Sequence, residues 1–275
     1  MVRADREPYV GRVVLDERNI MSSKLDLSKE FIGRRALVTG GSRGIGAAIA
    51  QRLLDAGANV VVAARSRSDA TPAAATFISG DVRTSEGVKA IAREALAALG
   101  GLDILVNNAG GSRAFLEGSA TIPDEEWQDT LALNLLSAVR LTNAVLPALR
   151  ASKAAAIVNI SSTAATIPFG PFAHYCAAKA ALDAYSRTLA VELASSGVRV
   201  NVVTPGPVAT PSADELRKTF TDGMGVPADA FVQQVPLGRL GTTDDVAEVV
   251  ALLASDRGRW LTGGNYRVDG GMTAR

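Results

Sequence analysis

Short β-branched hydrophobic runs alternate along the chain with longer segments of helical periodicity. Near-continuous apolar strands separated by helices are typical of a parallel sheet that is covered on both faces. The pattern therefore predicts an α/β fold, a doubly wound parallel sheet of about seven strands with helices on both faces. The runs are "RALVT" (35–39), "NVVVAA" (59–64), "ATFIS" (75–79), "LDILVNN" (102–108), "AAIVNIS" (155–161), "VRVNVVT" (198–204) and "YRV" (266–268), and the helical segments are about 44–56, 85–99, 124–150, 172–195 and 243–255.

Three stretches depart from this alternation. The connection "RSRSDATPAA" (65–74) is short and contains a proline, so we expect little helix there. Residues 207–242 are rich in Pro, Gly and Thr, with one amphipathic piece at about 212–220, and are typical of a substrate flap. The first 20 residues mix both charge signs without an apolar h-region, which argues against a signal peptide, and we expect residues 1–30 to form a loosely ordered extension ahead of one domain at 31–275.

Composition narrows the class of protein. A chain of 275 residues, 47% hydrophobic and 21% charged, can bury one large core. Its formal net charge of +1 gives no reason to expect nucleic acid or a membrane surface as partner. A single cysteine excludes an internal disulfide, and no run of 18 apolar residues occurs, which together indicate a cytoplasmic protein. One His and one Cys cannot build a metal cluster.

A glycine-rich turn, "TGGSRGIG" (39–46), follows the first predicted strand. Gly40, Gly44 and Gly46 permit a tight turn and close backbone approach, so that free amides at a helix N-terminus can meet a pyrophosphate. The alternative is a tight turn that binds nothing. The strand before it, the amphipathic helix after it and the second strand at the expected distance favour a dinucleotide site.

The end of the second strand bears on the choice of dinucleotide. Proteins that bind NAD usually place Asp or Glu there, whereas this chain has Ala64 followed by Arg65. Arg43, inside the glycine turn, is a second guanidinium that can reach a 2′-phosphate. NADP(H) is therefore favoured over NAD(H). The alternative is that both arginines are solvated surface charges, as Arg67 nearby suggests.

Tyr175 and Lys179 lie four residues apart in a helical segment, which places their side chains on one face. A nearby ammonium stabilises a phenolate, and lowering a tyrosine pKa from ~10 to ~7 requires about 4 kcal/mol, for which an oxidised nicotinamide would add a second positive charge. Tyr175 could then exchange a proton with a substrate oxygen while Ser162 hydrogen-bonds the same oxygen. The alternative is a partly buried tyrosine beside a snorkelling lysine.

Five motifs in order resemble the short-chain dehydrogenase/reductase family, over residues from about 31 to 275. They are TGxxxGxG at 39–46, "NNAG" at 107–110, "NISS" at 159–162, YxxxK at 175–179 and "PGPVAT" at 205–210. Ser162 also precedes Tyr175 by the 13 residues that the family shows. The resemblance implies a single Rossmann-type domain and extends to reductases that act on carrier-protein-bound 3-oxoacyl groups.

The resemblance also implies the roles of individual residues. Tyr175 would be the acid/base, Ser162 would orient the carbonyl, Lys179 would hold the nicotinamide ribose, and Asn134 would support a water relay. Ile45 would offer its amide to the pyrophosphate. The remaining implied cofactor contacts are Gly40, Ser42, Arg43, Gly44, Gly46, Arg65, Pro205 and Gly206, then Asp81 and Val82 at the adenine, Asn108, Ala109 and Gly110 at the adenosine ribose, and Val208 and Thr210 at the carboxamide.

Substrate and partners are predicted more coarsely. Candidate pocket walls are Arg113, Phe115, Ile167, Phe169, Phe172, His174, Leu216, Phe220, Met224 and Phe231, which suggest an apolar or aromatic carbonyl compound. His174 and Cys176 point about 100° away from Tyr175 and are interpreted as packing or pocket wall. Arg140 matches one carrier-binding arginine of the family, but Val191 stands where another is expected, so a free ketone and a carrier-bound acyl group both remain open. The family usually pairs the helices at 172–195 and about 130–150 into a homodimer or homotetramer.

Three functional hypotheses follow. The first is an NADPH-dependent reductase that converts a ketone to a secondary alcohol, with Tyr175 as acid/base. The second is an NAD-dependent alcohol dehydrogenase working in the oxidative direction, and the third is a non-catalytic NADP-binding protein. An enoyl reductase is a lesser option, because such relatives space the Tyr and Lys more widely.

Overall fold

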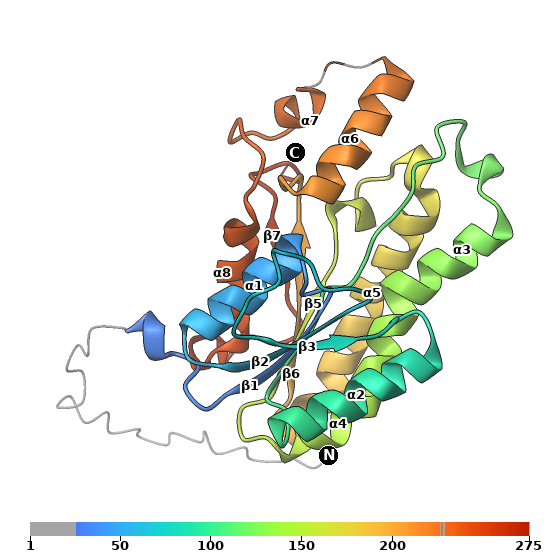
Figure 1. Cartoon of the computed structure of the whole chain (residues 1–275). Coiled ribbons are helices and arrows are strands. Elements are labelled where there is room, and N and C mark those ends of the chain that lie inside the picture. The colour runs from blue at the N-terminus through green and yellow to red at the C-terminus, as the bar shows by residue number, and fades with distance from the viewer. Residues whose placement is uncertain (1–25, 226, 228, 275) are drawn as a thin grey trace, which may run out of the picture.

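The computed structural model describes residues 26–225, 227 and 229–274, and its seven strands form one sheet in the order β3-β2-β1-β4-β5-β6-β7 (Figure 1). All six neighbouring pairs are parallel, which confirms the predicted fold class. The strands are β1 Arg35–Thr39, β2 Asn59–Ala64, β3 Thr76–Ser79, β4 Ile104–Asn107, β5 Ala156–Ile160, β6 Arg199–Pro205 and β7 Asn265–Val268. The helices are α1 Gly44–Asp55, α2 Ser85–Leu99, α3 Asp124–Leu131, α4 Ser137–Ala151, α5 Ala173–Leu193, α6 Pro211–Met224, α7 Ala230–Gln233 and α8 Thr243–Ala254.

Two hydrophobic cores lie on opposite faces of the sheet. Helices α1 and α8 cover one face, while α2, α4 and α5 cover the other (Figure 1). Strand β1 serves both cores, because successive side chains of a strand point to opposite faces: Ala36 and Val38 belong to the first core and Leu37 to the second. A sheet buried on both faces explains why its strands are apolar throughout.

The strand order reverses between β1 and β4. From β1 the chain runs outward to β2 and β3, and then returns to place β4 on the other side of β1. The loops that follow β1 and β4 therefore diverge and leave a crevice at the carboxyl ends of the strands, which is where open α/β sheets bind ligands.

Several elements differ from the sequence prediction. The segment 124–150 is helical, but a π-helical turn, Ala132–Leu136, separates α3 from α4. Within 207–242, α6 is longer than the expected 212–220, and the short α7 was not predicted. The connection between β2 and β3 contains no helix, as predicted.

The folded part begins earlier than the predicted residue 31. Residues Leu27–Lys29 form a 3₁₀ turn, and the side chain of Glu30 is 8% exposed and ion-paired with Arg52 and Arg257. The start of the described chain is therefore attached to the face covered by α1 and α8. Residues 1–25, the rest of the predicted extension, lie outside the described residues.

Among the described residues, one helical stretch, 124–151, is long and apolar enough to cross a membrane by length and composition alone. Within it Leu141, Val145 and Leu149 are buried in the second core. This packing accounts for the apolar residues on that side of the helix.

Candidate active site

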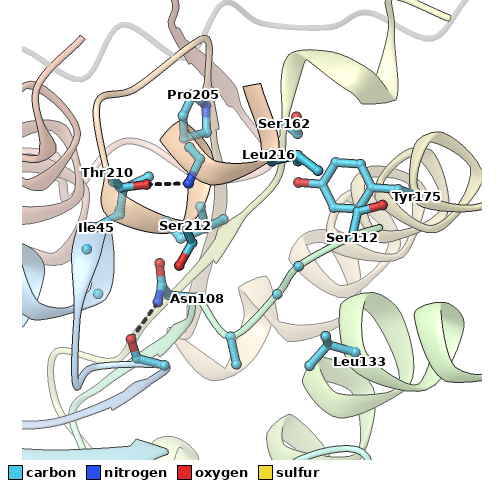
Figure 2. A pocket seen from close by; sticks show the side chains of 18 of the residues that line it. Ile45, Asn108, Ser112, Leu133, Ser162, Tyr175, Pro205, Thr210, Ser212 and Leu216 are labelled. Atoms are coloured by element: carbon cyan, nitrogen blue, oxygen red, sulfur yellow. Dashed lines mark hydrogen bonds between the residues drawn. The ribbon is translucent and has the colours of Figure 1, made fainter. Parts of the chain in front are cut away.

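A cavity of about 930 Å³ occupies the crevice at the carboxyl ends of β1, β4, β5 and β6 (Figure 2). Its volume suits a ligand of the size of a dinucleotide or a drug-like molecule. The structure brings nearly all of the predicted site residues together, with Asn134 as the exception. The predicted residues that line the cavity are Gly40, Ser42, Arg43, Gly44, Ile45, Gly46, Arg65, Asp81, Val82, Asn108, Ala109, Gly110, Ser162, Tyr175, Lys179, Pro205, Gly206, Val208 and Thr210.

Backbone conformation and close contacts explain why the glycine turn has no side chain at its key positions. Gly40 and Gly44 have φ of +66° and +56°, in the left-handed region that favours glycine. A Cβ on Gly46 would lie 2.3 Å from both the Asn108 Nδ2 and the Gly40 carbonyl oxygen. Helix α1 begins directly at this turn, and Arg43 provides no side-chain cap, so the first-turn amides remain available for an anion.

Thr39, which the sequence reasoning missed, ties the loop after β4 to this turn. Its Oγ1 accepts hydrogen bonds from the backbone amides of Asn108 and Ala109, both at 3.0 Å. The Asn108 side chain donates in return to the Thr39 carbonyl at 2.9 Å and the Gly40 carbonyl at 3.3 Å. A threonine at a strand end, directly before a glycine turn, was the signal available.

Asn134 is 2% exposed and does not line the cavity. Its Oδ1 accepts from the Gly111 amide at 3.1 Å, and its Nδ2 donates to the carbonyls of Gly111 at 2.9 Å and Thr130 at 3.0 Å. The side chain therefore clamps the loop that begins with "NNAG". It lies in the π-helical turn, a feature that occurs frequently at functional sites.

Gly110 separates Asn134 from Lys179. A Cβ at this position would lie 2.9 Å from Asn134 Oδ1 and 3.3 Å from Lys179 Nζ. Lys179 is 3% exposed and donates to the Ile160 carbonyl at 2.8 Å. Burial lowers the pKa of Lys179 to about 8, and the negative charge of Asp183, one turn further along α5, opposes this shift.

The hydroxyls of Tyr175 and Ser162 both face the cavity, with Leu216 and Ser112 nearby (Figure 2). Ser162 Oγ accepts from the Ala164 amide at 3.2 Å, which leaves its own hydrogen free for another acceptor. Two hydroxyl groups, those of the half-buried Tyr175 and of Ser162, are thus placed at the same part of the cavity.

The pKa of Tyr175 differs from the sequence-based expectation. Burial raises the pKa of Tyr175 above its ordinary value, and the nearby Ser162 hydroxyl opposes this to a smaller extent. Lys179 Nζ lies 5.7 Å from the centre of the tyrosine ring and is directed to the Ile160 carbonyl. The lysine alone therefore does not lower the pKa of the tyrosine, because desolvation dominates.

Arg43 and Arg65 both lie exposed at the margin of the cavity, beside Ala64. Among the described residues, neither has a carboxylate within 4.0 Å. By contrast, the carboxylate of Asp81 pairs with Arg83 at 3.4 Å. Two guanidinium groups are thus available to an anionic ligand at the end of β2.

The predicted substrate walls divide into two groups. His174 is fully buried and packs edge-on against Phe115 and Trp127, with ring centroids 5.5 and 6.0 Å away, so His174 and Phe115 are packing residues and not pocket walls. Cys176 likewise packs toward the Phe169 carbonyl. The side chain of Met224 is outside the described part. The walls that do line the cavity are Arg113, Ile167, Phe169, Phe172, Leu216, Phe220 and Phe231.

No group of three or more His, Cys, Asp or Glu side chains among the described residues is placed to hold a metal ion.

Comparison with known proteins adds the following similarities. Residues 40–273 match a family model described as enoyl-(acyl carrier protein) reductase. The chain is 39% identical over 248 residues to the 3-oxoacyl-(acyl-carrier-protein) reductase FabG of Escherichia coli K12, covering 88% of this chain and 98% of that protein. It is also 39% identical over 249 residues to FabG of Pseudomonas aeruginosa PAO1, covering 87% and 97%. A crystal structure described as a short-chain dehydrogenase/reductase from Burkholderia xenovorans superposes with a TM-score of 0.84 at 35% identity, covering 90% of this chain and 99% of that one.

Proposed function

The chain belongs to the short-chain dehydrogenase/reductase family of oxidoreductases, and on that premise we propose that it reduces a ketone to a secondary alcohol with NADPH, Tyr175 donating the proton. One observation carries the proposal. The hydroxyls of Tyr175 and Ser162 line the same cavity as the glycine turn and two exposed arginines, Arg43 within that turn and Arg65 directly after β2. A proton donor and a dinucleotide cradle thus share one space.

The residues present fit NADP(H). The glycine turn is a cradle that a Cβ would fill, and the first-turn amides of α1 would hold the pyrophosphate. Arg43 and Arg65 would bind the 2′-phosphate, since no carboxylate occupies the end of β2. When bound, the cofactor supplies the hydride. The other proposed contacts are Ser42, Asp81, Val82, Asn108, Ala109, Gly110, Lys179, Pro205, Gly206, Val208 and Thr210.

The acid/base chemistry of the chain suits reduction. A raised pKa keeps Tyr175 protonated at neutral pH, as required of a group that gives a proton to a carbonyl oxygen as charge develops there. Ser162 donates a hydrogen bond to the same oxygen, because its Oγ is already held by the Ala164 amide. Lys179, with a pKa of about 8, is still mostly charged at pH 7 and stabilises the phenolate that Tyr175 becomes.

Asn134 acts through the loop it clamps. Its three hydrogen bonds fix Gly111 and hence Gly110, which lies against the Lys179 ammonium. We infer that this clamp keeps Lys179 in place, and that Asn134 also supports proton resupply to Lys179, as the family resemblance implies.

The relatives named above act on 3-oxoacyl groups, so ketones of the 3-oxoacyl type are the substrates to test first. Arg140, a carrier-binding candidate, donates to the Arg83 carbonyl at 2.6 Å, and the other candidate position, Val191, is apolar and 83% exposed. These observations support a free 3-oxo ester or thioester over a carrier-bound one. A cytoplasmic homodimer or homotetramer is proposed from the resemblance alone.

The test of activity is NADPH oxidation with acetoacetyl-N-acetylcysteamine. Tyr175→Phe should lose at least a hundredfold in kcat/KM, the range for removal of a general acid. Tyr185→Phe, on the same helix but away from the cavity, is the matched control and should keep its activity. Reduction of the C=C bond of crotonyl-N-acetylcysteamine in place of the ketone would instead make the chain an enoyl reductase, as the family model is described.

The test of cofactor choice is calorimetric titration with NADPH and NADH. We expect NADPH to bind at least tenfold more tightly, about 1.4 kcal/mol. Arg65→Gln should remove most of this preference, whereas Arg67→Gln should not, because Arg67 lies over the Phe77 ring and does not line the cavity. Equal binding, or tighter binding of NADH, would favour an NAD-dependent alcohol dehydrogenase.

A further inference from the structure

Four of the seven phenylalanines of the chain line the cavity. Phe169 and Phe172 come from the turn that leads into α5, Phe220 from α6 and Phe231 from α7. We call these four residues the phenylalanine wall. They belong to segments far apart in the sequence, so their meeting follows from the fold.

The four rings form one connected cluster with Phe220 at its centre. The Phe220 ring centroid lies 5.3 Å from that of Phe169, 6.4 Å from Phe172 and 5.8 Å from Phe231, with interplanar angles of 41°, 33° and 67°. Phe169 and Phe172 are also 5.9 Å apart. Tilted and edge-on arrangements at these distances are the favourable geometries of aromatic pairs.

The phenylalanine wall belongs to neither hydrophobic core of the molecule. Phe220 is 9% exposed, while the other three rings are half-buried and present part of their surface to the cavity. Large apolar rings that line a cavity instead of filling a core are typical of a ligand-binding surface. An added ring could join the cluster in the same tilted geometry.

Arg113 forms a polar part of the cavity wall, and its charge is neutralised by a neighbouring carboxylate. Arg113 forms an ion pair with Glu126 at 3.0 Å and lies 4.9 Å from the centre of the Phe115 ring. Because the guanidinium charge is matched by a carboxylate, this part of the cavity wall offers no counter-charge to an anionic group of a substrate.

The position of the phenylalanine wall fixes where an apolar group would sit. Phe172 is the N-cap residue of α5 and lies three residues, about one helical turn, before Tyr175. A group that contacts Phe172 is thus close to the oxygen that receives the proton from Tyr175. An apolar group held there is attached to the carbonyl carbon or lies within a few atoms of it.

We propose that this enzyme prefers uncharged 3-oxo compounds that carry an aromatic ring at the carbonyl, with the ring bound on the phenylalanine wall. The inference rests on the proposed ketone reductase function and adds a substrate class to it. It distinguishes this chain from an enzyme that selects straight acyl chains, because a cluster of four rings presents flat surfaces and not an extended groove.

The test compares two esters of nearly equal size, ethyl benzoylacetate and ethyl 3-cyclohexyl-3-oxopropanoate, in reduction with NADPH. The ratio of their kcat/KM values is measured in the unaltered enzyme, in Phe172→Leu and in Phe220→Leu. Differences in intrinsic reactivity between the esters cancel, since they are the same for every variant. We expect each substitution to lower the aryl-to-cyclohexyl ratio by threefold to tenfold, about 0.7–1.4 kcal/mol.

A binding measurement compares the aryl and cyclohexyl groups without the reduction step. The two product alcohols are used as inhibitors, and the aryl alcohol should inhibit at least threefold more strongly in the unaltered enzyme but not in Phe172→Leu. Phe77→Leu is the matched control, since Phe77 lies on β3 outside the cavity, and it should keep the ratio. Thermal melts identify a variant that has lost its fold, in which case Phe169→Leu takes its place.

The outcomes separate the inference from the function. If both esters are reduced and the ratio is unchanged in Phe172→Leu and Phe220→Leu, the substrate class is wrong and the ketone reductase function stands. If neither ester nor the acetoacetyl thioester is reduced by a protein that binds NADPH, the proposed function itself fails. A lowered ratio together with weaker aryl inhibition supports the inference.

Discussion

Gly110 has no side chain, and the arrangement of Asn134 and Lys179 in the site depends on this. The residue lies where a Cβ would meet Asn134 Oδ1 at 2.9 Å and Lys179 Nζ at 3.3 Å. Gly110→Ala should therefore displace the ammonium and lower kcat by about tenfold to a hundredfold, the cost of misplacing a catalytic group by a fraction of an ångström to an ångström. Steady-state kinetics of the purified variant checks this.

Gly111→Ala provides the control for Gly110→Ala. A Cβ on Gly111 has ordinary contact distance to its nearest neighbour, Leu133 Cδ2 at 3.8 Å, and its φ is not in the left-handed region. We expect kcat within about twofold of the unaltered enzyme, because the backbone bonds to Asn134 are kept. Equal losses in both variants would mean that the loop tolerates no substitution at all, and the contact with Lys179 would not be the cause.

A second residue-level prediction concerns the pH dependence of activity. Lys179, with a pKa of about 8, loses its charge as pH rises through 8, and the Asp183 carboxylate holds that pKa up. Asp183→Asn removes the negative charge, so the pKa of Lys179 falls and the high-pH decline of kcat/KM should begin at lower pH. A profile of kcat/KM from pH 6 to 10 measures the shift.

The surroundings of Asp183 define the control for that profile. Arg187 on the same helix and Asn265 on β7 also face the carboxylate, and Asn265 donates to it at 2.9 Å. Glu192→Gln removes an exposed carboxylate from the same helix and should leave the profile in place. An unshifted high-pH limb in Asp183→Asn would assign that limb to Tyr175 or to another group.

Among the secondary-structure elements, the π-helical turn Ala132–Leu136 matters most to the site, because it positions the Asn134 side chain that holds the loop after β4. Asn134→Ala removes three hydrogen bonds, including the buried one to the Thr130 carbonyl, which should cost about 1–3 kcal/mol of unfolding free energy. Thermal denaturation should show Tm lower by roughly 2–10 °C for a domain of this size. Asn143→Ala, exposed on the following helix α4, should change Tm by no more than about 2 °C.

The sequence predicts regular elements better than irregular ones, and the reason is physical. The strands and α1, α2 and α8 follow from hydrophobic period, because their apolar residues face a core. A π-helical turn adds one residue to one turn, and "LALNLLSAV" has the same apolar spacing with or without it. Helix α7 is four residues long and has no buried residue, so no period marks it.

At the scale of the whole molecule, the site follows from strand order more than from any one motif. The glycine turn and "NNAG" are 61 residues apart from Gly46 to Asn107, and they meet because β4 returns beside β1. The motifs predicted which residues line the cavity, but not that Asn134 and Thr39 hold its loops by hydrogen bonds. They also could not separate His174, buried between aromatic rings, from Phe172, which faces the cavity two residues earlier.

The last prediction concerns the ion pairs at the amino ends of the strands, opposite the cavity. Glu30 binds Arg257 through both oxygens, at 2.5 and 3.2 Å, and Arg52 on α1 at 3.4 Å, so it joins the start of the described chain to α1 and to the turn after α8. Its side chain is 8% exposed and that of Arg52 is 15% exposed, while Arg257 at 31% retains part of its hydration. Glu30→Gln leaves two guanidinium groups without this carboxylate.

We expect Glu30→Gln to lower the unfolding free energy by about 1–3 kcal/mol, less than for a fully buried pair because Arg257 is partly screened and Arg52 keeps Glu248 at 2.7 Å. Urea denaturation followed by circular dichroism measures the change. Glu94→Gln, which breaks an exposed pair with Arg93, should stay within about 0.5 kcal/mol. Because the triad lies at the edge of the sheet opposite the cavity, NADPH affinity should be the same in all three proteins at a temperature where each is folded, and a weakened affinity in Glu30→Gln would show that the two edges of the sheet are energetically coupled.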